Sequence, residues 1–353
     1  MSSDYGYINA RVKAMKSRLL ARETLYELLG ARDLAVLADI LGSTDYSRDL
    51  QEALTHGSGL PALEEGFRRN LCRTTAKLLE IADGEPGELL EVIIERWDLE
   101  NIKAVLRGKH NRLSKEEILS SIVPAGRLDE VRVSELAGAE DAKAVADMLA
   151  TWHSPFARAL TRALPAYLQD NDLPATELAL DRFYFMAGLE TVSTGDGNAA
   201  VVRGVLQEQL DAVNLRTVLR LRGVTLEEER LKGYWVGEGG RITAGKFVAL
   251  SRIENISQAL DRAHLSVQLS EKPGDEAALE NALSRALSFK HAKLFWGDPL
   301  RINVPIGYLW MKTIEVTNLR LIARGKAYGL AQLEIERELL LFLRFSNHGD
   351  PSF

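Results

Sequence analysis

The sequence has few of the residues that form disulfides, metal sites and membrane spans. Its 353 residues include one cysteine, Cys72, which cannot form an internal disulfide and offers no zinc-ligand spacing. The six histidines show none of the His or Glu spacings typical of a metal site. The strongest apolar run, residues 339–343, has five residues, whereas a membrane span needs about 18. These shortages predict a reducing compartment, no metal, no cofactor and no inserted membrane segment.

Excess positive charge is also lacking. The formal net charge is −6, and 46% of the residues are hydrophobic and 27% charged. This composition is typical of a soluble globular protein and argues against a dedicated nucleic-acid binder, which is usually basic. It also argues against docking on anionic lipid through bulk charge. Because the N-terminus shows no charged-then-apolar leader, we expect any membrane association to be peripheral.

One short motif occurs three times in the chain. It reads acid, two free residues, Asn, Ile/Leu, Lys/Arg, one free residue, Val/Ile, Leu/Ala, Arg, and it occupies residues 98–107, 211–220 and 315–324. Asn101 and Asn214 are 113 positions apart, and Asn214 and Asn318 are 104 apart. Near-equal spacing indicates three copies of one larger unit. We therefore predict three repeats, residues 1–113, 114–226 and 227–353.

Linkers repeat along with the motif. Gly126-Arg127-Leu128 begins 25 residues after Asn101, and Gly240-Arg241-Ile242 begins 26 residues after Asn214. Apolar residues recur three or four apart throughout, and alternating strand patterns are scarce. The predicted fold is all-α, with three similar helical bundles.

Local signals place several helix boundaries. We expect one helix over residues 5–29 and a second that starts at an Asp33 cap and ends at Gly42. Residues 43–60 contain several breakers and are expected to be looser. Ser114 and Glu117 form a predicted capping box, and a final helix is expected over residues 331–345.

On a helix, the motif separates into two faces. At 100° per residue, the acid and the Asn lie at the edge of an apolar arc. A buried Asn must find hydrogen-bond partners, so we expect these side chains to bind backbone of a neighbouring helix or repeat. Direct contact with a ligand is the alternative. The structural-motif residues are Asp98, Asn101, Asp211, Asn214, Glu315 and Asn318.

The opposite face of each motif helix carries two basic residues. A pair of cations four residues apart is usually a solvated face. If the three repeats packed around one axis, however, six cations would suit an acidic helical end of another protein. The candidate partner-binding residues are Lys103, Arg107, Arg216, Arg220, Arg320 and Arg324.

One stretch resembles a phosphate-binding loop. Residues 240–246 match its first seven positions, but Phe247 stands where a Ser or Thr should reach magnesium. The corresponding segment after Gly126 has no Gly-Lys, and no buried strand precedes either stretch. We interpret residues 240–246 as a turn and predict no catalytic residues.

The triplicated motif, the Gly-Arg-Leu/Ile linkers and the opening Tyr7-Ile8-Asn9-Ala10-Arg11-Val12 together resemble a known family. They are similar to the C subunit of archaeal and bacterial V/A-type rotary ATPases, which is related to the d subunit of the eukaryotic vacuolar enzyme. The resemblance runs from about residue 5 to 345. The third copy departs from the pattern with Glu315, with Ala323, and with no Gly-Arg linker after it.

The resemblance implies a non-catalytic funnel of three bundles with pseudo-threefold symmetry. Such a protein would be a monomer within a hetero-oligomeric complex, peripheral on the cytoplasmic side of the membrane. Its partners would be the D and F subunits of the central shaft and the membrane proteolipid ring, between which it would transmit torque for ion transport, most commonly of protons. Two alternatives remain: a helical-repeat scaffold for unrelated helical partners, and an all-α enzyme that uses residues 240–246.

Overall fold

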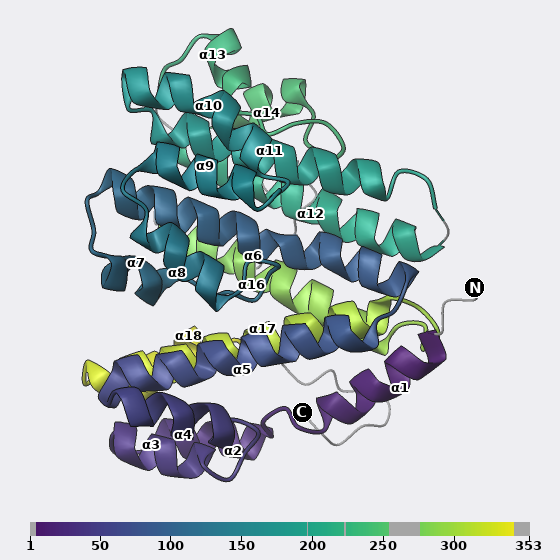
Figure 1. Ribbon diagram of the computed structural model, residues 1–353. Coiled ribbons are helices and arrows are strands. Elements are labelled where there is room, and N and C mark those ends of the chain that lie inside the picture. Colours follow the sequence, from purple (N-terminus) through teal and green to yellow (C-terminus); the bar gives the residue numbers. More distant parts are fainter. Residues whose placement is uncertain (1–4, 196, 222–223, 254–275, 342–353) are drawn as a thin grey trace. The chain divides into compact units, whose positions relative to one another are not determined.

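Every regular element that the structure describes is helical, which confirms the all-α prediction (Figure 1). The computed structural model describes residues 5–195, 197–221, 224–253 and 276–341. The first helices are α1 (Tyr5–Lys16), α2 (Arg22–Gly30), α3 (Leu34–Leu41), α4 (Ser47–His56), α5 (Gly59–Ile81) and α6 (Glu85–His110). The middle helices are α7 (Lys115–Ser121), α8 (Glu130–Gly138), α9 (Ala142–Thr151), α10 (Ala157–Asp170), α11 (Leu173–Thr191) and α12 (Gly197–Arg220). The last elements are α13 (Glu228–Gly233), α14 (Ala244–Ser251), α16 (Glu276–Ala292), η1 (Lys293–Trp296), α17 (Asn303–Ala327) and α18 (Gln332–Glu338).

The chain divides into two compact units. One contains the residues up to Leu90 together with those from Ser288 onward, and the other contains Glu91–Leu287. The divisions fall inside the long helices α6 and α16. The boundaries predicted after residues 113 and 226 remain a prediction.

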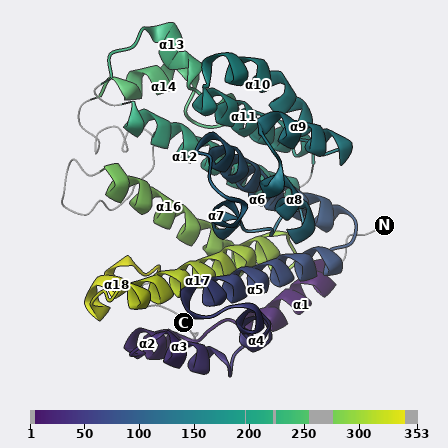
Figure 2. The ribbon, with the colours of Figure 1, turned by 60° about the vertical axis from the view of Figure 1, so that its left-hand side comes forward.

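The unit with both chain ends is built on α5 and α17, which lie side by side in both views (Figures 1 and 2). Leu63, Phe67 and Leu71 follow one face of α5 at helical spacing and are buried. Gly66 lets α4 approach closely, since a Cβ there would lie 3.1 Å from the Cα of Leu50. Close packing of α4, α5 and α17 holds the start and the end of the sequence together.

The second unit contains the first two motif helices, α6 and α12. Its α10 packs against α9 and α11, and α14 packs against α12. One buried cluster joins Leu215 and Leu219 of α12 to Phe247 of α14 and Leu283 of α16. In this cluster, the second motif helix packs against helices that follow it in the sequence.

Several local predictions are confirmed. Asp33 caps α3 by accepting a hydrogen bond from the Val36 amide, and Gly42 follows the end of that helix. Ser114 and Glu117 form the predicted capping box at α7.

Three other local predictions are wrong. The helix expected over residues 5–29 is interrupted between α1 and α2, where the Leu20 amide binds Glu315. The final helix stops at Glu338, and the Leu340 amide binds Asn318. Both helices end where a motif side chain binds backbone. Residues 43–60, expected to be loose, contain α4.

Candidate functional site

The first motif acid, Asp98 on α6, is buried against the Gly-Arg-Leu linker. Its Oδ2 accepts a hydrogen bond from the Arg127 amide at 2.8 Å, and its Oδ1 accepts one from the Leu128 amide at 2.9 Å. Gly126 is required at this point because a Cβ there would lie 2.0 Å from Asp98 Oδ1. The linker thus repeats in the sequence because its backbone wraps around a carboxylate.

The second motif acid, Asp211 on α12, repeats this arrangement. Its two oxygens accept hydrogen bonds from the amides of Arg241 at 3.0 Å and Ile242 at 2.9 Å. A Cβ at Gly240 would lie 2.3 Å from Asp211 Oδ1. The stretch 240–246 therefore gives two of its amides to an internal carboxylate, which explains its likeness to an anion-binding loop without a phosphate.

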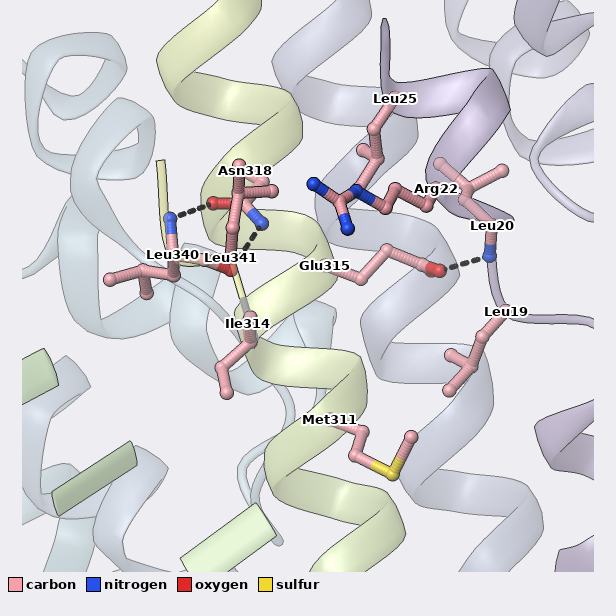
Figure 3. A pocket seen from close by; sticks show the side chains of 10 residues that line it. All are labelled: Leu19, Leu20, Arg22, Leu25, Met311, Ile314, Glu315, Asn318, Leu340 and Leu341. Carbon is pink, nitrogen blue, oxygen red and sulfur yellow. Dashed lines mark hydrogen bonds between the residues drawn. The ribbon is translucent and has the colours of Figure 1, made fainter. Parts of the chain in front are cut away.

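The third motif acid, Glu315 on α17, has a different set of partners (Figure 3). Its Oε2 accepts a hydrogen bond from the Leu20 amide at 2.5 Å, from the beginning of the chain. Its Oε1 accepts one from the Tyr46 hydroxyl at 2.7 Å and one from Lys312 Nζ at 2.6 Å. A hydroxyl and an ammonium thus replace the second amide of the other two sites.

The third site also concentrates buried charge. Lys312 is 1% exposed and its Nζ lies 4.2 Å from the centre of the Tyr46 ring. Burial, with Glu315 nearby, raises the pKa of Tyr46 well above its ordinary value, so the hydroxyl remains a donor. In the first site, burial raises the pKa of Asp98 to about 6, against the lowering effect of its two amide bonds.

The motif asparagines bind backbone at a constant distance along the sequence. Each binds the residue 22 positions later, just before the segment that binds the acid in the first two copies. The three pairs are Asn101 with Val123, Asn214 with Val236 and Asn318 with Leu340. Asn101 and Asn318 also donate to the carbonyl of the same residue, at 2.8 and 3.0 Å.

We use "acid–Asn site" for each such acid and Asn with the backbone groups they bind. In the first two sites, the acid binds the segment that follows its motif helix. In the third, it binds the segment at the start of the chain. Leu128, Ile242 and Leu20 are equivalent, since each is buried and directly precedes the N-cap residue of a helix.

The outer cations of the basic stripe pair with glutamates of this chain. Arg107 makes two bonds to Glu177 on α11, at 2.6 and 2.7 Å, through Nε and Nη2. Arg220 makes the same two bonds to Glu280 on α16, at 2.7 and 2.8 Å. Arg324 binds Glu64 on α5 through Nε at 2.5 Å. In all three pairs the arginine Nε binds the glutamate, and the pairs remain partly exposed.

The inner cations face three different neighbours. Lys103 forms a buried ion pair with Asp181 at 2.9 Å. Arg216 donates to the Ser284 hydroxyl at 3.0 Å. Arg320 Nε lies 3.8 Å from Glu64, beyond hydrogen-bond distance, and is buried without a hydrogen-bond partner among the described residues.

Sequence reasoning missed the glutamates. Glu64 and Glu177 are 113 positions apart, and Glu177 and Glu280 are 103 apart, nearly the spacing of the motif asparagines. That spacing is a signal that could have found them. The prediction that the basic stripe binds a partner remains a prediction, and the glutamate pairs give these cations a role within the chain.

Comparison with known proteins gives this geometry a family. A profile described as "ATP synthase (C/AC39) subunit" matches residues 8–338. The chain belongs to this family. Residues 8–338 include all three motif helices and the Glu64, Glu177 and Glu280 partners, so most of each acid–Asn site lies inside the family's matched region.

Relatives within the family extend over nearly the whole chain. The C subunit of the V-type ATP synthase of Deinococcus radiodurans is 29% identical over 339 residues, which cover 96% of this chain and 92% of that protein. The C subunit of the A-type ATP synthase of Methanococcoides burtonii is 30% identical over 353 aligned residues, which cover 96% of this chain and 95% of that protein. The corresponding A-type protein of Haloferax volcanii is 29% identical over 343 residues, which cover 95% of this chain and 97% of that protein.

Metal-binding clusters and membrane spans are both absent from the part of the chain that the structure describes. In the described ranges, no group of three or more His, Cys, Asp or Glu side chains is arranged to hold a metal ion. None of the described helices combines the length and apolar character needed to cross a membrane.

Proposed function

We propose that this family member is a non-catalytic coupling subunit of a V/A-type ATPase or ATP synthase. It would act as a socket between the D and F subunits of the central shaft and the membrane proteolipid ring, on the cytoplasmic side of the membrane. The observation that carries this proposal is the threefold repetition of the acid–Asn site, in a chain whose relatives are named as C subunits of ATP synthases.

The chemistry of these sites supports a mechanical role. The motif acids and asparagines are buried and spend their hydrogen bonds largely on the chain's own backbone. A well-bonded buried polar network makes a fold rigid and specific. A protein that transmits torque needs such rigidity, whereas a catalytic site needs groups aimed at a substrate.

We further propose that the three sequence repeats form three bundles around a pseudo-threefold axis, as a funnel. The matching bonds of the three motif helices support this arrangement, because equal bonding implies equal local packing. The prediction of proton transport and of a peripheral place in the complex belongs to the same proposal.

Co-purification tests the proposal. A tagged copy expressed in place of the native protein should bring down shaft proteins and the proteolipid ring from solubilised membranes. Recovery of the tagged chain without either partner would contradict the socket. Washing membranes at increasing salt concentration provides a control, because weak polar contacts with stray proteins are lost as salt screens them.

A charge exchange can test the basic stripe without dismantling the bundles. Arg107→Glu combined with Glu177→Arg keeps the ion pair but reverses the charge at the motif helix, and Arg220 with Glu280 offers the same exchange. If the stripe binds the shaft, the exchanged proteins should bind it more weakly while unfolding like the parent. Unchanged binding would leave the stripe with its internal role only.

A further inference from the structure

The third acid–Asn site closes the chain in a way that the other two do not. In the first site, Val123 and Leu128, which bind the Asn and the acid, lie five residues apart on one loop. In the second, Val236 and Ile242 lie six residues apart. In the third, Leu340 and Leu20 come from opposite ends of the sequence.

A cavity lies at this break (Figure 3). Its volume is about 60 Å³, and its lining includes both motif side chains and both backbone partners. These lining residues are Leu19, Leu20, Glu315, Asn318, Leu340 and Leu341. In the first site, the stretch 124–127 joins the two backbone partners covalently, so the cavity marks the place where the third copy lacks that stretch.

The basic side of the third motif helix is also the least satisfied. The residue four positions after the paired glutamate is Asp181 in the first copy, Ser284 in the second and Arg68 in the third. The first two bind the inner cation directly. In the third copy, Arg320 therefore has another arginine at the place where Lys103 has a carboxylate.

From these observations we propose that the third site is a seam, defined as the junction of Leu20 and Leu340 with Glu315 and Asn318. The seam opens locally, while the first and second sites stay closed. A loop that spans a site keeps its two bonds at high effective concentration, so one bond cannot move far while the other holds. Across the seam, nothing covalent nearby returns a released partner, and local opening is correspondingly more frequent.

Amide hydrogen exchange tests the seam with controls inside the same molecule. In the intact chain, the amides of Leu20 and Leu340 should exchange at least about tenfold faster than those of their equivalents in the other copies. The equivalents are Leu128 and Val123 in the first site and Ile242 and Val236 in the second. A common rate for all six amides would overturn the proposal.

Two variants sharpen the test. Tyr46→Phe removes one hydrogen bond to Glu315 and should speed exchange at the seam by about fivefold to tenfold, with the other four amides unchanged. Tyr184→Phe is the matched control, because that buried hydroxyl binds the Val92 carbonyl in the other unit. It should leave the seam rates unchanged. If Tyr46→Phe speeds all six amides equally, opening is global and the seam is wrong.

A gain-of-protection variant completes the design. Arg68→Ser gives the third copy the side chain that Arg216 has at Ser284, and Arg69 remains to pair with Glu65. Exchange at Leu20 and Leu340 should slow by about threefold as the like charge disappears. Faster exchange would show that Arg68 stabilises the seam and would contradict the proposal.

Discussion

The first and third acid–Asn sites achieve the same closure by different means. Asp98 accepts two amides from one loop, whereas Glu315 accepts one amide, a hydroxyl and an ammonium from separate elements. The shorter acid goes with Gly126, and the longer acid goes with Arg18 at the equivalent place, two residues before the last amide. The comparison teaches that a chain end can replace a loop when buried charge replaces the missing covalent link.

Removal of Lys312 should have the largest effect on this comparison. Lys312→Met leaves Glu315 buried with no compensating charge, which should lower the free energy of unfolding of that unit by about 3–5 kcal/mol. Denaturant unfolding would measure the change. Adding Glu315→Gln should restore part of the loss, because it removes the unpaired charge. A double variant that is less stable than the single one would contradict this account.

The first site should show its difference as a pH dependence. Folded Asp98, with a pKa of about 6, keeps a proton that the unfolded chain releases near its ordinary value of 3.8. Raising the pH from about 4 to about 6 should therefore lower the contribution of this group to stability, by up to about 3 kcal/mol. Asp98→Asn should remove that slope in unfolding measured across this range. An identical slope in the variant would show that other groups cause it.

The glycine difference should give an intermediate effect. Gly126→Ala forces a methyl group against the Asp98 carboxylate and should destabilise its unit by about 1–3 kcal/mol. Gly204→Ala is the control, because a Cβ there meets nothing within 4 Å and the position lies inside α12. That control should be neutral or stabilising by up to about 1 kcal/mol. Thermal unfolding that ranks the two variants in the opposite order would refute the close approach.

The arginine–glutamate pairs should show the smallest effect and the least difference between copies. Arg107 and Arg220 are partly exposed, so a double-mutant cycle with Glu177 or Glu280 should give about 0.2–1 kcal/mol. A coupling energy of several kcal/mol in either pair would mean that it contributes to the bundle as much as the buried sites do. The expected small value makes these residues suitable for tests of partner binding.

The motif residues indicate what sequence reasoning reaches and where it stops. Period and residue type were enough to predict helices, three copies of the motif and an Asn that seeks backbone. They could not reveal that Leu20 serves Glu315, because that contact joins residues 295 positions apart. Both misplaced helix ends lie at Leu20 and Leu340, where a tertiary hydrogen bond takes an amide from the local pattern. Glu280 and its two equivalents were missed because a solvated face and a paired face look alike in sequence.

The constant interval of 22 residues has a consequence for how many copies the chain can hold. Each of the first two motif helices binds a segment of the next repeat, and the acid of the last one binds a segment of the first. Excision of residues 114–226 would place Val236 again 22 positions after Asn101, with an Asp and a Gly-Arg-Ile linker still in register. Gene duplication could therefore add or remove a repeat without orphaning a single motif bond. The number three is not written in these bonds, and the selection that fixed it must act on what the assembled copies fit.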